Sequence, residues 1–175
     1  MFKIVAIVGI SVILFLILIV YLAKPQVSTD VTQKGEGSVV TVSPTEAPVA
    51  FKASFAIFTS GTFRVFSAAM YHNLSDDVFI QADNPNIIHV KKNGVTWSDF
   101  FKTLPMELTN TCLTTGTKQT FCTNDKSSLR FFLNDQKTDD LLLREIRPGD
   151  KALITYGSES EQQLERQFGQ VPNPL

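Results

Sequence analysis

Histidine and cysteine are scarce in this chain, and neither sign of charge dominates it. Two histidines and two cysteines occur among 175 residues, with 16 basic against 17 acidic side chains. A nucleic-acid-binding surface needs a concentrated positive field, which this balance does not supply. The sequence also has no G-x-S-x-G nucleophile motif. We therefore expect no enzyme activity, no bound cofactor and no nucleic-acid partner.

Metal ligands are few and have no recognised spacing. His72 and His89 share one stretch of the chain with Met70, Asp76, Asp77 and Asp83. No pair among them has HxH or HExxH spacing. Adjacent acids at 76–77 and 139–140 would point to opposite faces of a strand, so neither pair predicts an acid–base couple. We favour ordinary surface or hydrogen-bonded histidines, with a metal site at His72 and His89 as the alternative.

The longest apolar run occupies residues 4–23 and contains no charged side chain. At about 1.5 Å per residue, a helix of this length spans the roughly 30 Å hydrocarbon core of a bilayer. A cleaved signal peptide has a shorter apolar region and small residues at the cleavage site, whereas Tyr21 lies two positions before Ala23. The sequence predicts an uncleaved single-pass membrane anchor at residues 1–23.

The flanking charges alone do not settle the orientation, because Lys3 and Lys24 lie on opposite sides of the run. The short leader and the even number of cysteines favour a cytoplasmic N-terminus. Residues 24–50 are rich in Ser, Thr, Val, Pro and Gly and lack aromatic residues. Such a stretch buries too little apolar surface to offset its ordering entropy. We predict a flexible linker that presents the following domain outside the cytoplasm.

Residues 51–157 carry most of the 14 phenylalanines and predict one folded domain. Runs rich in aromatic and β-branched residues indicate strands. The first two, 52–59 and 62–67, predict a hairpin with Phe58 opposite Phe63 and Phe55 opposite Phe66. Further strands or strand-like segments are expected at 78–81, 86–91, 129–133, 141–146 and 151–156.

The clearest helical pattern covers residues 96–104. Thr96 and Asp99 have capping-box spacing, and Pro105 ends the helix. One apolar stripe is formed by Trp97, Phe100, Phe101 and Leu104. A helix of two turns is unstable alone in water, so it must be docked. We expect Trp97 and Phe101 to anchor it in the core.

The two cysteines lie on opposite arms of a second predicted hairpin. Its arms are residues 106–114 and 118–123, on either side of Thr115-Gly116-Thr117. Nine residues separate Cys112 from Cys122, unlike the two of a thioredoxin-type motif. Disulfides persist outside the cytoplasm. We predict a structural Cys112–Cys122 disulfide, with redox handling as the alternative.

Two signals mark the end of the domain. Arg147-Pro148-Gly149-Asp150 predicts a tight turn in which Gly149 accepts a positive φ. Beyond the last strand, Ser158 and Glu161 have capping-box spacing and predict a helix at 158–168. Leu164 and Phe168 could dock this helix, and Gly169 should end it. We expect the last residues of segment 158–175 to fray.

Three segments resemble a group of membrane-anchored prokaryotic proteins of unknown function. They are GVTWSDFF (94–101), LRFFLN (129–134) and PGDKALITYG (148–157). More distantly they resemble transcobalamin-like β-grasp domains. The resemblance implies an α+β fold, a β-grasp-like mixed sheet with one short packed helix, in which Gly149 and Asp150 are structural. The chain departs from the pattern at Asn134-Asp135, which lacks the usual glycine, and at Lys91, where such relatives have the second histidine of HxH.

These features together favour a single-pass membrane protein that displays a binding or interaction module. Its partner would be an unknown protein or small molecule. The alternatives are a metal- or redox-handling surface protein that uses His72/His89 or Cys112/Cys122, and, by analogy alone, a domain that binds a corrinoid-like ligand. Asn73-Leu74-Ser75 also fits the glycosylation acceptor pattern.

Overall fold

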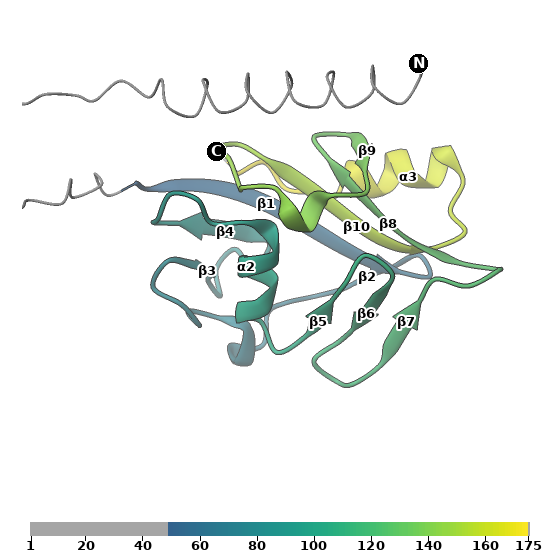
Figure 1. Ribbon diagram of the computed structural model, residues 1–175, viewed down its shortest axis with the longest axis horizontal. Helices are drawn as coiled ribbons and strands as arrows, with labels where there is room; N and C mark the ends of the chain where they lie inside the picture. The colour runs from purple at the N-terminus through teal and green to yellow at the C-terminus, as the bar shows by residue number, and fades with distance from the viewer. Residues whose placement is uncertain (1–48, 175) are drawn as a thin grey trace, which may run out of the picture. The chain divides into compact units, whose positions relative to one another are not determined.

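A mixed β-sheet lies at the centre of the described part of the chain, residues 49–174 of a computed structural model (Figure 1). Its strands run in the order β3-β4-β1-β10-β8-β9, and β2 pairs with β1 outside this path. The strands are β1 (Phe51–Thr59), β2 (Thr62–Phe63), β3 (Val78–Ile80), β4 (Ile87–Val90), β8 (Ser128–Leu133), β9 (Gln136–Thr138) and β10 (Lys151–Gly157). The spatial order of the strands differs from their order in the sequence, and β1 and β10 are neighbours at the centre of the sheet.

A smaller three-stranded sheet and two helices complete the fold of residues 49–174, which is α+β. The small sheet has the order β5-β6-β7. These elements are β5 (Glu107–Leu108), β6 (Cys112–Thr114), β7 (Thr120–Cys122), α2 (Trp97–Thr103) and α3 (Glu161–Phe168), with 3-10 turns η1 (Ala69–Tyr71) and η2 (Leu141–Leu143). The predicted anchor at 1–23 and almost all of the predicted linker lie outside the described residues. Within residues 49–174, no helix is long and apolar enough to cross a membrane.

The two central strands, β1 and β10, are parallel, with Ser54 opposite Lys151 and Thr59 opposite Tyr156. β4 pairs antiparallel with the other edge of β1, and β8 pairs antiparallel with β10. Both central strands therefore have partners on each side. Both faces of these strands are also covered by apolar clusters, and a strand covered on both faces needs apolar residues at almost every position.

The first predicted hairpin is correct for two residue pairs only. Phe58 does face Phe63, and their ring centroids are 5.2 Å apart. Phe66 lies beyond β2, although its ring still packs edge-to-face on Phe55 at 5.1 Å. The chain leaves the sheet after Phe63, because the rest of that edge of β1 pairs with β4. The long antiparallel partner of β1 is thus β4 and not the segment next to it in sequence.

Alternate residues of β1 serve two cores. Phe55 and Ile57 belong to the larger core, together with Trp97 of α2 and Leu113 of the small sheet. Ala56 belongs to a second core on the opposite face, to which Phe168 of α3 also contributes. Figure 1 shows the same division, with α2 and β5–β7 on one side of the sheet and α3 on the other. The sheet is therefore covered on both faces.

Helix α2 forms as the sequence predicts. The Asp99 backbone N–H donates to Thr96 Oγ1 at 3.1 Å, and the Thr96 backbone N–H donates to Asp99 Oδ2 at 3.0 Å. The predicted anchors are buried, Trp97 at 0% exposure and Phe101 at 2%. Their rings stack with centroids 6.2 Å apart. The capping box sets the start of the helix, and the apolar stripe holds it on the core.

Several predicted boundaries change. The arm predicted at 106–114 is two strands, β5 and β6, which pair with each other. Segment 141–146 is a 3-10 turn followed by an isolated bridge from Thr96 to Glu145, because the chain here crosses beside α2 and not along the sheet. Strand β9, which pairs with β8, was not predicted, since its sequence Gln-Lys-Thr has no apolar signal.

The C-terminal segment is also corrected. Helix α3 begins after Ser160, whose hydroxyl accepts from the Gln163 N–H, and not after Ser158. Leu164 and Phe168 do pack on the second core, as expected. The tail beyond Gly169 does not fray completely, because Val171 is 5% exposed and belongs to that core.

Candidate functional site

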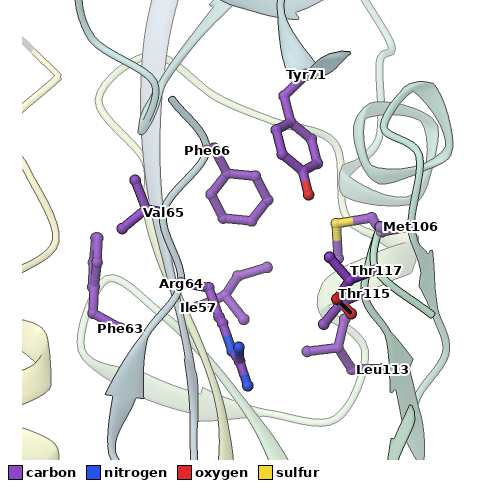
Figure 2. Close-up of a pocket in the computed structure, with 11 residues that line it drawn as sticks. Ile57, Phe63, Arg64, Val65, Phe66, Tyr71, Met106, Leu113, Thr115 and Thr117 are labelled. Atoms are coloured by element: carbon purple, nitrogen blue, oxygen red, sulfur yellow. Dashed lines mark hydrogen bonds between the residues drawn. The ribbon is translucent and has the colours of Figure 1, made fainter. Parts of the chain in front are cut away.

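One cavity of about 200 Å³ lies between the small sheet and the chain that follows β2 (Figure 2). We call it the Arg64 pocket. Its lining residues are Ile57, Phe63, Arg64, Val65, Phe66, Tyr71, Met106, Leu113, Thr115, Gly116 and Thr117. Arg64 is the single charged member of this set. The pocket is thus largely apolar, with one cation and a few hydroxyl groups.

Aromatic rings close one end of the pocket. The chain leaves β2 after Phe63, passes through Phe66 and turns at η1, which places Tyr71 beside Phe66. The rings of Phe66 and Tyr71 are 5.1 Å apart, edge to face. Phe66 is 5% exposed and also contacts Phe55 of the core. In Figure 2 the Tyr71 hydroxyl points toward the wall that carries Met106 and the threonines.

The facing wall is the turn between β6 and β7. Its ends are joined by two backbone hydrogen bonds. The Lys118 N–H donates to the Thr115 carbonyl oxygen at 2.9 Å, and the Thr115 N–H donates to the Gln119 carbonyl oxygen at 2.8 Å. A Cβ on Gly116 would lie 2.7 Å from Tyr71 Oη and 3.1 Å from the carbonyl oxygen of Pro105. A larger residue here would displace the Tyr71 hydroxyl or shift the turn away from Pro105. Glycine therefore allows the two walls to lie this close.

The opposite end of the pocket is formed by Arg64. Its Nε donates to Thr59 Oγ1 at 2.5 Å, and its guanidinium carbon lies 5.1 Å from the centroid of the Phe121 ring. These contacts hold the guanidinium against β7 at this end of the pocket. Among residues 49–174, no carboxylate forms an ion pair with Arg64. The positive charge is oriented by the protein but not neutralised by these residues.

Exposed apolar side chains occur on the same segment as the pocket. Val65 is 63% exposed and Met70 is 49% exposed, and Leu74 follows at 45%. Met70 Cε would lie 3.4 Å from a Cβ on Gly116, so Met70 reaches over the turn. The rim of the pocket is therefore apolar and open to solvent.

The predicted disulfide is confirmed, and it closes the hairpin that forms the pocket wall. Cys112 of β6 lies directly opposite Cys122 of β7. Their sulfur atoms are 2.08 Å apart, and their Cα atoms are 4.1 Å apart. Leu113, the next residue, lines the pocket and is 1% exposed. The disulfide thus fixes the strands on which this wall is built.

The two histidines do not come together in a metal-binding cluster. His72 Nε2 is 2.8 Å from the carbonyl oxygen of Phe66, and His89 stacks on Phe79 with centroids 5.2 Å apart. Burial, followed by the positive charge of Lys52 across the strands, lowers the pKa of His89 below its ordinary value. Within residues 49–174, no group of three His, Cys, Asp or Glu side chains could hold a metal ion.

Sequence reasoning missed the Arg64 pocket. The one local signal is a charged residue, Arg64, inside the otherwise apolar run Phe63-Arg64-Val65-Phe66. In a strand, the apolar residues on either side of this arginine would be buried. Nothing in that run indicates Gly116, which lies far along the chain. The site exists only because the small sheet folds back over the end of β1.

Comparison with protein-family models, with curated proteins and with solved structures finds no match to this chain.

Proposed function

We propose that this protein is a membrane-anchored binding module whose ligand site is the Arg64 pocket. The observation that carries the proposal is the pocket itself, an apolar cavity with one oriented cation and few other polar groups. Ligand sites commonly have this composition, because apolar walls supply affinity and a small number of polar groups fix orientation.

The proposal includes the cellular location of the module. The apolar run at residues 4–23 supports a single-pass anchor with a cytoplasmic N-terminus. The Cys112–Cys122 disulfide supports a domain outside the cytoplasm, where disulfides persist. The order β4-β1-β10-β8-β9, with β1 and β10 as its parallel pair and α2 on one face, supports a β-grasp domain.

The size of the pocket supports a small ligand. Its volume of about 200 Å³ is below the roughly 300–1,000 Å³ typical of sites for drug-sized molecules. A corrinoid would extend far beyond such a cavity. The second expectation, metal handling, gains no support from the positions of His72 and His89, so the small-ligand function is preferred.

A fragment screen on the full-length chain in lipid nanodiscs tests the proposal. Binding of fluorinated fragments is followed by ¹⁹F NMR, with empty nanodiscs as the blank. Thr117→Trp fills the pocket from its exposed turn, and Thr111→Trp is the matched control on the same hairpin outside the pocket. We expect hits that bind the parent and Thr111→Trp but not Thr117→Trp. Hits that bind all three proteins alike, or no hits at all, would refute the proposal.

A further inference from the structure

We infer that the ligand of the Arg64 pocket is a small organic acid, with its carboxylate on Arg64 and its apolar body between the two walls. This inference depends on the proposed function, because it names the class of ligand for the same site. It begins from the positive charge of Arg64. Among residues 49–174, this guanidinium contacts the Thr59 hydroxyl and the Phe121 ring but forms no ion pair.

The hydrogen-bonding capacity of Arg64 is only partly used. A guanidinium has five N–H donors in a rigid, planar fork. Nε donates to Thr59, whereas the structure gives the two Nη groups no acceptor among the described residues. The Thr59 bond and the Phe121 ring restrict the rotation of the fork without occupying its far edge. An orientated fork with free donors suits a carboxylate, which it can bind through two parallel hydrogen bonds.

The remaining lining selects the body of the acid. Ile57 forms the floor, and Leu113 of β6 faces it together with Met106, which precedes β5, as Figure 2 shows. Phe66 closes the far end. Contact with these side chains removes apolar ligand surface from water, which is favourable in proportion to the area buried. The space between Arg64 and Phe66 therefore fits a molecule with one charged end and one apolar end.

The lining also argues against ligands of the other charge. No acidic side chain lines the pocket, so an ammonium group would meet Arg64 without a counter-charge. The hydroxyls of Tyr71, Thr115 and Thr117 can accommodate a neutral polar group, but they bring no net charge. Discrimination between an acid and an amine of the same shape should therefore be strong.

Three probes with one body and different head groups test the inference. They are 3-phenylpropanoate, 3-phenylpropan-1-ol and 3-phenylpropylamine, titrated by calorimetry into the full-length chain in nanodiscs, with empty nanodiscs subtracted. We expect the acid to bind at least about tenfold more tightly than the alcohol, which is about 1.4 kcal/mol. The amine should bind more weakly than both. This ranking on the parent protein does not depend on any variant folding.

Variants then assign the preference to its cause. Arg64→Gln should remove the advantage of the acid and leave the alcohol affinity within about twofold. Arg166→Gln, an exposed arginine of α3 on the opposite sheet face, is the matched control and should behave as the parent. Melting curves check that both variants are folded.

The outcomes separate this inference from the proposed function. If acid, alcohol and amine bind the parent equally and all lose binding in Thr117→Trp, the pocket is a ligand site but the acid assignment is wrong. If an acid preference persists in Arg64→Gln, or if no probe binds the parent, the inference is likewise overturned. The fragment screen then decides separately whether the pocket binds anything.

Discussion

The side chain of Asn134 binds the carboxylate of Asp150 across the closing turns of the domain. Asn134 Nδ2 donates to Asp150 Oδ1 at 2.9 Å, and Asn134 Oδ1 accepts the backbone N–H of Lys151 at 2.9 Å. The other oxygen of Asp150 accepts from the Arg147 N–H at 2.9 Å, and Asp150 is 6% exposed. One asparagine thus connects the end of β8 to the start of β10.

These bonds explain a turn that lacks glycine. Asn134 and Asp135 both have positive φ, 51° and 65°. Two-residue hairpin turns of this kind usually have glycine at such positions, although asparagine and aspartate tolerate them. At Asn134 the side-chain hydrogen bonds outweigh the conformational advantage that glycine would bring. Asp135 is exposed and makes no such contact to β10.

The two turn positions should therefore respond differently to glycine. Asn134→Gly removes both hydrogen bonds and leaves Asp150 with one fewer donor, so we expect a loss of about 1–3 kcal/mol in the free energy of unfolding. Asp135→Gly relieves positive-φ strain at no such cost and should be neutral or stabilising by up to about 1 kcal/mol. Denaturant unfolding of the two variants measures this. Equal effects would contradict the explanation.

Trp97 should be the most sensitive position in α2. Truncation of this fully buried indole to alanine leaves a large cavity, so Trp97→Ala should destabilise by about 3–5 kcal/mol. The indole Nε1 has no hydrogen-bond partner among residues 49–174, so Trp97→Phe loses volume but none of these polar contacts and should cost less. The same denaturant titrations test both variants. A cost below about 1 kcal/mol for Trp97→Ala would be inconsistent with a buried anchor.

The disulfide should contribute measurably to stability. In the chain-entropy model, a cross-link that closes a loop of about ten residues stabilises by about 3 kcal/mol. We expect a thiol reductant to lower the melting temperature of the parent. A Cys112→Ser/Cys122→Ser double variant should melt lower from the start and be insensitive to the reductant. Alkylation of unreduced protein, read by mass spectrometry, gives the direct check, since labelled thiols would show that the bridge is absent.

His89 should make folding sensitive to mild acid. Burial, then Lys52 and Lys91, lower its pKa in the folded protein, and Asp83 opposes them. The unfolded chain, with a histidine pKa near 6.5, then binds the proton more readily as the pH falls. Stability should drop as the pH decreases through about 6.5, and less so in His89→Gln. Unfolding free energies of both proteins at several pH values test this, and parallel pH profiles would exclude a role for His89.

Membrane attachment tests the proposed location of the protein. If residues 4–23 span the bilayer, the full-length chain should remain with membranes through carbonate extraction. A chain without these residues should be released. Recovery of a mature soluble chain that begins near Lys24 would instead identify a cleaved signal sequence.

The parts of the fold that sequence predicts are those with a local physical cause. The capping box of Thr96 and Asp99 and the positive φ of Gly149, 83°, depend on residues within one turn. The Cys112–Cys122 pair could be placed because a hairpin joins neighbours in the chain. For each of these features, the residues that determine the structure are also the residues that form it.

Pairing between distant segments has no such local signal. The apolar run of β1 could pair with the next strand-like segment or with any later one, and only packing selects β4 and β10. The Arg64 pocket is missed for the same reason, since Arg64 and Gly116 are brought together by the fold of the small sheet. The Arg64 pocket could therefore be found only from the three-dimensional arrangement, whereas helix α2 could be predicted from the sequence.

The central pairing of β1 with β10 has a consequence for biogenesis. The first and last strands of the domain are parallel neighbours, so the sheet cannot be completed until nearly the whole sequence is available. Folds with many such sequence-distant contacts pass through a slow, entropically costly closure. A chain that crosses a membrane with its N-terminus held back would emerge strand by strand, and its core would assemble only after Lys151–Gly157 had been delivered. If the domain is exported as proposed, this topology favours transport of an unfolded chain that folds on the far side.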